Sequence, residues 1–542
     1  MAAAPGFTDE VRADREARYQ SWFAEGWYGG QTAPEAMAEG LLRHPEVELV
    51  LHADGHLTRA TLREVHERGV RVAAGLASLG LRSGDTVAIQ VPNWLEGIVT
   101  LYGAMRLGLV VVPLVHIYGP TEVSFILRQS RARALVVPDR WRSIDYTARV
   151  AALTEVPSLE HVVVLGDEVP AGAVSWHELV ERADPEAAPP PDRSADDVCL
   201  LVYTSGTTAE PKGVLHTHNT FLSEVRAMPA ILGRTEGTVQ LSAFPAGHIA
   251  GVLGVARPFV HGTSSVIMDT WDPAAAAALI EEFGVTATAG TPFHLTTLLD
   301  AAEGAGRDLS TLGDFMLGAA SVPPAVIERA QAAGIAAYRC YGSTEHPTIT
   351  SSVASDPIAK RAGTDGRPIG ANRVRLVDDD GHDVPPGTPG EVVSIGPEQC
   401  LGYTDPALNR DAFLPGGWFR TGDIGVLDGD GFLTITDRKK DIIIRGGENL
   451  SSKEIEDVLA RHPAVAEAAV VGMPDPLYGE RACAFVILAP GAAPIGLEEV
   501  RAHFVTAGVA KQKTPERVEV VAELPRTPAG KVKKFELRKR LG

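Results

Sequence analysis

The chain has few cysteines for its length. Its 542 residues include only four, at positions 199, 340, 400 and 483, and no two of them have a CxxC spacing. Cysteines scattered in this way predict reduced thiols and argue against a disulfide framework. A chain of this length can bury a large apolar core without a covalent cross-link, and it is long enough for about two to five folding units.

Long apolar runs are also absent. No stretch approaches the ~20 residues that cross a bilayer, and the apolar run Leu107–Val115 is interrupted by Pro113. The first residues do not combine a basic segment with an apolar one. We therefore predict no signal peptide and no membrane span, and we expect a cytoplasmic protein.

Positive charge is scarce. The chain has 50 Lys and Arg residues against 69 Asp and Glu residues, a net charge of −19. An acidic chain repels phosphate backbones, which disfavours a nucleic-acid partner. A small anionic substrate stays compatible with this charge, because a local site can oppose the sign of the whole protein.

Three common enzyme signatures are missing. The chain has no GxSxG elbow, which argues against a serine hydrolase, and no GxGxxG turn, which argues against a dinucleotide-binding fold. The loop Tyr203–Gly213 (YTSGTTAEPKG) is not a Walker loop either, because Pro211 stands at its second glycine and no hydroxyl residue follows Lys212.

Up to about residue 370, predicted strands alternate with predicted helices, as in α/β proteins with parallel sheets. A proline-rich stretch at 184–196 is typical of a surface connector. We expect helices over Leu57–Leu81, Trp94–Leu107 and Asp272–Phe283, and strands over Thr86–Val91, Leu109–Leu114, Ala134–Val137, Leu159–Leu165 and Val198–Tyr203.

The pattern changes beyond about residue 370. Short segments between turn-forming residues predict antiparallel strands at Val374–Val377, Gly390–Ile395 and Gly431–Thr436. The charged stretch 437–441 precedes a compact α/β segment of about a hundred residues, whose helix begins near Ser452. We place a domain boundary at 437–441.

Four segments carry candidate chemistry, and each has a plainer explanation. In Tyr203–Gly213, small and hydroxyl residues with Lys212 suit phosphate binding, but they also suit a surface turn. In Cys340–Glu345 (CYGSTE), an aromatic ring suits a purine and Glu345 suits Mg²⁺, although such turns are common. Trp418–Asp423 offers a carboxylate for ribose or a simple β-turn. Leu524–Lys534 offers Lys531 for transition-state charge or a solvated basic tail.

The order of these segments in one chain resembles the adenylate-forming superfamily of acyl-CoA synthetases, adenylation domains and firefly luciferase. The resemblance runs from about Thr58 to Arg538. Within this superfamily, the sequence is most similar to acyl-CoA synthetases that act on medium-chain, cyclic or aryl acids. The segments that carry it are ASLGLRSGDTVAIQVPNW, YTSGTTAEPKG, GHIAG, YGSTE, GWFRTGD, DRKKDIIIRGGENLSSKEIE and PRTPAGK.

This resemblance implies an α/β fold with two α/β subdomains and a β-barrel in an N-terminal domain, 1–437. It also implies a hinge at 438–441 and a small mobile α+β domain at 442–542. The implied reaction has two steps. A carboxylate attacks the α-phosphorus of ATP and releases pyrophosphate, and a thiol, that of CoA, then displaces AMP. Mg²⁺ is the implied metal, and the implied state is a monomer or homodimer.

The resemblance also implies roles for individual residues. Thr344 would touch the α-phosphate, Glu345 would bind Mg²⁺, and Lys531 would drive adenylation. Lys440 would be the hinge residue, whose motion withdraws Lys531 and brings Arg445 and the two following glycines to the thiol tunnel. ATP would be held by Thr204, Ser205, Gly206, Thr207, Thr208, Lys212, Gly318, Ala319, Ala320, Tyr341, Gly342, Asp423 and Arg438.

His248 matches the position beside the acyl pocket in this family. The nearby pair His216 and His218 has no third ligand in the sequence, so we interpret both as structural residues. The pocket walls are expected from the same matches: Phe244, His248, Ile249, Gly251, Phe293, Leu317, Gly318, His346, Pro347 and Thr348. His346 either contacts a polar group of the substrate or caps a turn.

Three positions depart from patterns within the family. Ala209 replaces a glycine of the phosphate loop, and its methyl group restricts positive φ there. Ile249 stands where relatives that activate catechol acids carry Asn, which disfavours 2,3-dihydroxybenzoate. Ile444 stands where some coumarate ligases and luciferases carry a second lysine, which many acyl-CoA synthetases also lack.

Other reactions fit the same residues. The adenylate can pass to the thiol of a carrier protein or to an amine, and some relatives adenylate nitrite to diazotise an aryl amine. A nucleotide-binding pseudoenzyme is a further alternative. An acid:CoA ligase is the reading that the sequence favours.

Overall fold

A computed structural model describes residues 7–190, 193–204, 211–232, 237–320, 322–445, 448–507, 509–526 and 531–541 of the chain. The chain divides into two compact units, and each is described by itself. The first comprises Met1–Arg373 and Ser394–Phe419, and the second Val374–Val393 and Arg420–Gly542. The domain boundary expected at 437–441, with its hinge at 438–441, stays a prediction. No helix in the described ranges is both long enough and apolar enough to cross a membrane.

The first unit contains a nine-stranded sheet with the order β18-β17-β16-β15-β14-β12-β13-β1-β2. The run from β16 to β1 is parallel, and the flanking strands are antiparallel. Its strands are β1 (Glu48–Ala53), β2 (His56–Thr61), β12 (Val239–Ser242), β13 (Ser264–Met268), β14 (Ala287–Gly290), β15 (Asp314–Leu317), β16 (Ala336–Tyr341), β17 (Thr350–Ser351) and β18 (Arg367–Pro368). The connecting helices are α10 (Ile249–His261), α11 (Pro273–Phe283), α12 (Pro292–Ala305), α13 (Pro324–Ala332) and α14 (Ile358–Gly363).

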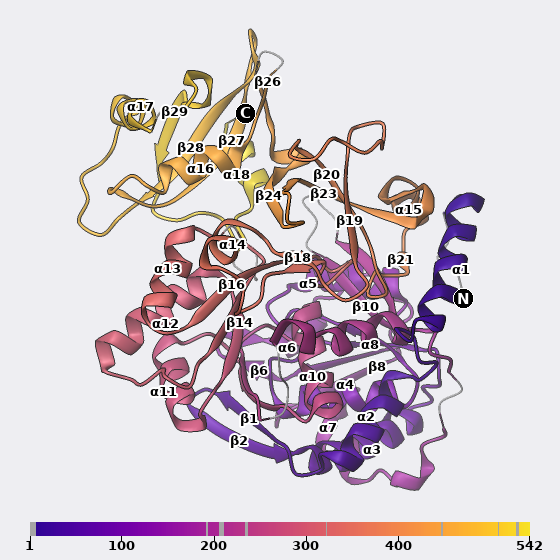
Figure 1. Ribbon diagram of the computed structural model, residues 1–542. Coiled ribbons are helices and arrows are strands. Elements are labelled where there is room, and N and C mark those ends of the chain that lie inside the picture. The colour runs from indigo at the N-terminus through magenta and orange to yellow at the C-terminus, as the bar shows by residue number, and fades with distance from the viewer. Residues whose placement is uncertain are drawn as a thin grey trace. The chain divides into compact units, whose positions relative to one another are not determined.

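The same unit contains an eight-stranded sheet with the order β21-β11-β10-β4-β3-β5-β8-β9. Its strands β8, β10 and β21 are labelled in Figure 1. Its strands are β3 (Thr86–Ile89), β4 (Val110–Pro113), β5 (Ala134–Pro138), β8 (His161–Leu165), β9 (Val174–Ser175), β10 (Val198–Thr204), β11 (Lys212–Thr217) and β21 (Gly402–Tyr403). The short strands β6 (Arg140–Trp141) and β7 (Ile144–Asp145) form a separate hairpin, and β22 (Phe413–Leu414) pairs with the start of β23 (Trp418–Leu427).

The remaining helices of the first unit accompany these strands. They are α1 (Asp9–Ala24), α2 (Ala33–Arg43), α3 (Leu62–Ser78), α4 (Leu95–Arg106), α5 (Pro120–Ser130), α6 (Tyr146–Ala151), α7 (Trp176–Glu181), α8 (His218–Ala227), α9 (Pro229–Leu232) and α15 (Pro406–Ala412), with the 3₁₀ turns η1 (Pro185–Ala187) and η2 (Pro415–Gly417). A large apolar core joins residues of α3, α4 and α10 with residues of β3, β4 and β10.

Helix α3 begins later than its apolar pattern suggested. Thr61 caps it: its side chain accepts a hydrogen bond from the Glu64 backbone N–H, and the Glu64 carboxylate accepts one from the Thr61 backbone N–H. The residues before this cap pair with β1 as β2. The expected helix over Leu57–Leu81 is therefore wrong at its start, where 57–61 form a strand, and the other elements expected up to residue 283 are present within a few residues.

Close packing of α3 on α4 depends on two glycines. A Cβ atom at Gly69 would lie 2.4 Å from the ring of Tyr102, and a Cβ atom at Gly103 would lie 2.6 Å from the carbonyl oxygen of Gly69. Tyr102 is completely buried, so it cannot move aside. These glycines therefore allow the two helices to approach at backbone distance.

We expect Gly69→Ala to destabilise the first unit by about 1–3 kcal/mol, because overpacking a dense core costs about that much. The measurement is the melting temperature of the purified chain by scanning fluorimetry. Gly304→Ala is the matched control, because this helical glycine of α12 has nothing within 4 Å of the added Cβ. A melting temperature for Gly69→Ala that equals that of Gly304→Ala would contradict the packing described here.

The second unit has two sheets. In one, β19 (Arg373–Val377), β20 (Gly390–Ile395), β23 and β24 (Leu433–Arg438) are adjacent in that order. The other has the order β26-β25-β28-β27, with β29 beside β28. Its strands are β25 (Ile443–Arg445), β26 (Glu448–Leu450), β27 (Val465–Asp475), β28 (Gly479–Leu488) and β29 (Arg517–Val520).

The helices of this unit are α16 (Ser452–Leu459), α17 (Leu497–Thr506) and α18 (Lys534–Lys539), and its 3₁₀ turns are η3 (Lys439–Asp441) and η4 (Lys511–Lys513). The three strands predicted beyond residue 370 are present as β19, β20 and β24, and the helix starting near Ser452 is confirmed. The predicted antiparallel orientation is confirmed for β24, which pairs with β23. The predicted β-barrel is corrected: among the described residues the strands form an open path and no pairing closes it. The α/β class itself is confirmed.

Candidate active site

Four neighbouring parallel strands of the nine-stranded sheet end at one edge. Their order is β16-β15-β14-β12, and the chain segment after each of them holds residues expected at the site. In open α/β sheets, ligands bind beyond the carboxyl ends of the strands. Phe244, His248, Ile249 and Gly251 follow β12, Phe293 follows β14, Leu317 ends β15 before Gly318, Ala319 and Ala320, and Tyr341 ends β16 before Gly342, Thr344, Glu345, His346 and Pro347.

The turn after β16 is tight. The backbone N–H of Ser343 donates to the His346 carbonyl at 2.9 Å, and that of Ile349 donates to the Tyr341 carbonyl at 2.9 Å. A Cβ atom at Gly342 would lie 1.9 Å from the Pro347 carbonyl oxygen, so only glycine fits there. This turn presents Thr344 and Glu345 on a closely held backbone.

The segment after β15 is also constrained. Ala319 has a φ of 63°, a left-handed conformation that residues with a side chain seldom adopt. A Cβ atom at Gly318 would lie 2.8 Å from the Cys340 sulfur. The ends of β15 and β16 therefore lie against each other where the adenine-binding residues are expected.

Two atoms of Glu345 accept hydrogen bonds from neighbouring residues. Only 9% of the residue is exposed. Its Oε1 accepts a hydrogen bond from the Tyr403 hydroxyl at 2.7 Å, and its carbonyl oxygen accepts one from the Cys400 backbone N–H at 2.7 Å. Within the described residues, Oε2 has no hydrogen-bond partner. A carboxylate with one oxygen tied and one available is a suitable hard ligand for Mg²⁺.

His216 holds Thr344, the residue before Glu345 in the turn after β16. Its Nε2 lies 2.8 Å from the Thr344 carbonyl oxygen, and its Nδ1 lies 3.2 Å from the Thr220 hydroxyl. Burial lowers the pKa of His216 to about 4, so the ring is neutral at pH 7 and donates one hydrogen to the carbonyl. The Nδ1 of His218 accepts from the Ala33 backbone N–H instead. These contacts agree with the structural role predicted for the pair.

Two of the expected phosphate ligands, Thr204 and Lys212, lie at the end of the β10–β11 hairpin. Thr204 and Lys212 are directly paired across it, and the ammonium of Lys212 lies 5.6 Å from the centroid of the Tyr403 ring. Of the other expected phosphate ligands, Ser205, Gly206, Thr207 and Thr208 lie outside the described residues, as does Ala209.

His248 precedes α10 as its N-cap. A second imidazole, His116, lies near it and was not expected at the site. Burial first, and then the neighbouring His248, lower the pKa of His116 to about 4. The His116 ring packs edge-on against Trp141 at 4.6 Å, and the Trp141 indole N–H donates to the buried Asp269 carboxylate at 3.1 Å.

His346 lies in a buried polar cluster. The residue is 0% exposed, its Nδ1 is 3.0 Å from the Ser394 hydroxyl, and its Nε2 is 3.5 Å from the Glu398 carboxyl group. Burial lowers the pKa of His346 to about 4 and raises that of Glu398 to about 8. Both shifts favour uncharged forms, so this contact is a neutral one at pH 7 and not an ion pair. Its role in the acyl pocket stays a prediction.

The raised pKa of Glu398 makes stability depend on pH. The folded chain binds this proton more tightly than the unfolded chain, so the stabilisation is complete below pH ~4.5 and is lost as the pH rises to about 8. We expect Glu398→Gln, which still accepts a hydrogen bond from Asn372, to flatten this dependence by on the order of a few kcal/mol. Melting temperatures from pH 5 to 8 test this; parallel curves for the wild type and the variant would contradict it.

The other expected residues lie in the second unit. Arg438 faces Asp423 across β23 and β24, with its Nε 3.1 Å from the carboxylate. Lys440 lies in η3, and Lys531 is exposed beside the short bridge between Arg526 and Val532. The two glycines after Arg445 lie outside the described residues, whereas Arg445 itself forms an ion pair with Glu516 at 2.6 Å.

The fold therefore places many of the expected site residues beyond the carboxyl ends of parallel strands, and it provides a lysine and a carboxylate suited to phosphate and metal. Residues 39–404 match the family model of the AMP-binding enzymes, and residues 454–531 match the AMP-binding enzyme C-terminal domain. The chain belongs to this family of adenylate-forming ligases.

Known proteins of this family are similar over nearly the whole chain. The medium-chain fatty-acid–CoA ligase of Escherichia coli K12 is 34% identical over 97% of this chain and 93% of its own. The salicyl-AMP ligase / salicyl-S-ArCP synthetase of Mycobacterium tuberculosis is 32% identical over 98% of this chain and 94% of its own. The anthranilate CoA ligase AuaEII, solved with anthranoyl-AMP, has a TM-score of 0.85 and 28% identity, covering 94% of this chain and 97% of that one.

Proposed function

We propose that this enzyme activates a carboxylic acid with ATP and transfers the acyl group to the thiol of CoA. The carboxylate oxygen forms a bond to the α-phosphorus, the bond from the α-phosphorus to the bridging oxygen breaks, and pyrophosphate leaves. The thiolate then attacks the acyl carbonyl carbon and AMP leaves. Family membership and relatives that act on fatty and aryl acids support this proposal.

One observation carries the first step. The hydroxyl of Tyr403 binds Glu345, and the ammonium of Lys212 lies over the ring of the same tyrosine. A cation from the phosphate loop and a carboxylate suited to Mg²⁺ therefore lie within the reach of one side chain. That spacing suits a nucleotide polyphosphate, whose negative charge both a lysine and a metal can neutralise.

The chain's own residues then have the following proposed roles. Lys212 and Thr204 hold phosphate oxygens, Thr344 hydrogen-bonds the α-phosphate, and Glu345 would hold Mg²⁺, which when bound neutralises phosphate charge. Lys531 stabilises the charge that develops during adenylation. Asp423 and Arg438 hold the ribose, Tyr341 stacks on adenine with the segment after β15, His248 lines the acyl pocket, and Lys440 is the hinge.

A carrier-protein thiol is the second candidate acceptor. The salicyl-S-ArCP synthetase named above favours it, since that relative covers the same length of chain. The test is pyrophosphate and AMP release from ATP and Mg²⁺ with fatty, cyclic, cinnamic and benzoic acids, with and without CoA. Turnover that requires CoA supports the ligase, whereas adenylate formation that CoA does not accelerate would overturn the CoA step and favour a carrier or an amine.

A further inference from the structure

Tyr403 comes from a part of the chain that carries none of the expected site residues. It is 5% exposed and ends β21, the edge strand that pairs with β11 through Val214. Its hydroxyl donates to Glu345 Oε1, 58 residues away in sequence, at 2.7 Å. The ring packs under Lys212, which starts β11. One side chain thus contacts both a proposed metal ligand and a proposed phosphate ligand.

The backbone of Tyr403 is fixed on both sides. The side chain of Asn409, which is 1% exposed, accepts a hydrogen bond from the Tyr403 N–H at 2.8 Å and donates one to its carbonyl oxygen at 3.0 Å. The residue three positions before it, Cys400, donates its backbone N–H to the Glu345 carbonyl. The segment 400–403 therefore holds Glu345 at its backbone and at its carboxylate.

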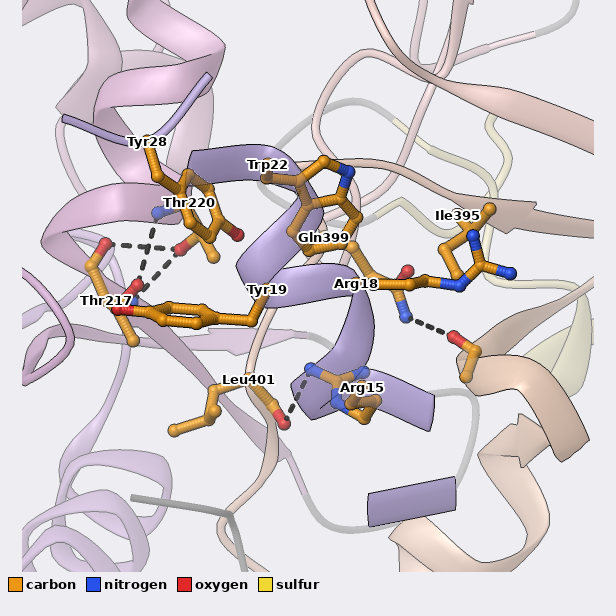
Figure 2. Close-up of a pocket in the computed structure, with 11 residues that line it drawn as sticks. Arg15, Arg18, Tyr19, Trp22, Tyr28, Thr217, Thr220, Ile395, Gln399 and Leu401 are labelled. Atoms are coloured by element: carbon orange, nitrogen blue, oxygen red, sulfur yellow. Dashed lines mark hydrogen bonds between the residues drawn. The ribbon is translucent and has the colours of Figure 1, made fainter. Parts of the chain in front are cut away.

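Helix α1 supports this segment from outside the family match, which begins at residue 39. Arg15 of α1 donates through Nη2 to the carbonyl oxygen of Cys400 at 2.8 Å. It also donates to that of Leu401 at 3.2 Å (Figure 2). Its guanidinium lies about 5 Å from the ring centres of Phe7 and Phe413. The cavity beside it measures about 20 Å³, room for about one water molecule, so α1 covers this segment closely.

We propose that Tyr403 is a positioning residue for Glu345, and that Arg15 of the N-terminal helix holds the segment that carries it. This inference rests on the proposed role of Glu345 in holding Mg²⁺. By occupying Oε1, the phenol fixes the rotation of the carboxylate and leaves Oε2 for the metal. Residues that orient metal ligands in this way typically change metal affinity about 10–100-fold when they are replaced.

The decisive variant is Tyr403→Phe, which removes the hydroxyl and keeps the ring beneath Lys212. The readout is Mn²⁺ binding by electron paramagnetic resonance in the presence of α,β-methylene-ATP, which requires no turnover. We expect about 10-fold weaker Mn²⁺ binding. We also expect a similar rise in the Mg²⁺ concentration that gives half-maximal adenylation, with the rate recovering at high Mg²⁺. An unchanged Mn²⁺ affinity would overturn the proposal.

Tyr338→Phe is the matched control, because Tyr338 is a second buried tyrosine, in β16, and its hydroxyl has no hydrogen-bond partner among the described residues. It should leave Mn²⁺ affinity unchanged; an equal loss would show a general effect of removing a buried hydroxyl. Tyr403→Phe should also add little in a Glu345→Gln background. Full additivity would show that Tyr403 does not act through Glu345.

Arg15→Met tests the support from α1, since it keeps an unbranched side chain between the two phenylalanine rings and removes the donors. We expect a smaller loss of Mn²⁺ affinity in the same direction. An unchanged Mn²⁺ affinity would overturn the proposed support from α1.

Different results would contradict the proposed function and the positioning role of Tyr403. A wild-type chain without Mg²⁺-dependent pyrophosphate release contradicts the proposed function, whereas active wild type with unaltered metal binding in Tyr403→Phe contradicts only the positioning role.

Discussion

Replacing Lys531 by Ala should lower the adenylation rate by about 10²–10³-fold, because removing a group that stabilises transition-state charge typically costs that much. Attack on the α-phosphorus brings a carboxylate toward phosphate oxygens of the same sign. The Lys531 ammonium would offset this repulsion most strongly in the transition state, where the negative charges of the carboxylate and the phosphate are closest together. The measurement is ATP–pyrophosphate exchange with the acid that the wild type uses.

The second half-reaction separates this role from a general one. Chemically prepared acyl-adenylate plus thiol should react at nearly the wild-type rate in Lys531→Ala, since no phosphorus attack remains. Lys533→Ala is the control: it removes a lysine two residues away that pairs with Glu536 at 3.0 Å. Exchange at the wild-type rate in Lys531→Ala would refute the assignment, and a nucleotide-binding pseudoenzyme would show no exchange even before substitution.

Glu345→Gln should reduce adenylation by at least about 10²-fold at millimolar Mg²⁺. A neutral amide oxygen is a weaker ligand for a hard cation than a carboxylate oxygen is. The amide oxygen still accepts from Tyr403 and the backbone contact with Cys400 is unaffected, so the fold should be retained. The loss should therefore appear in metal-dependent steps and not in the melting temperature.

The check is a Mg²⁺ titration of pyrophosphate release, together with a melting curve for each variant. Glu303→Gln is the control, because this exposed carboxylate of α12 lies at the surface. If Glu345→Gln retained the wild-type Mg²⁺ dependence, another residue would have to hold the metal.

The sequence was enough to predict the α/β class and the family, because the motif segments follow strands whose apolar runs are easily seen. Local signals explain the one helix start that was wrong. Asp54 and Gly55 both have positive φ, 48° and 78°, and form the two-residue turn between β1 and β2. An Asp-Gly pair is a strong hairpin signal, and it outweighs the apolar spacing that suggested a helix from Leu57.

The contacts around Glu345 were beyond prediction from the residues alone. Tyr403 meets Glu345 only because β21 pairs with β11 and the turn after β16 reaches the same place. His216 reaches Thr344 across 128 positions of sequence in a similar way. These contacts form only when distant segments pair in the right strand register. Neither a Gly-Tyr pair nor a lone histidine carries a local signal of that pairing. The raised pKa of Glu398 likewise follows from burial, which the sequence around it does not indicate.

Transfer of isotope from the acid to AMP tests the central claim most directly. The acid is labelled with ¹⁸O in both carboxyl oxygens and is turned over with ATP, Mg²⁺ and CoA. If the carboxylate attacks the α-phosphorus and the thiol then displaces AMP, one ¹⁸O atom from each acid molecule appears in the AMP phosphate. Label in inorganic phosphate with formation of ADP, or AMP without label, would contradict activation through an acyl-adenylate.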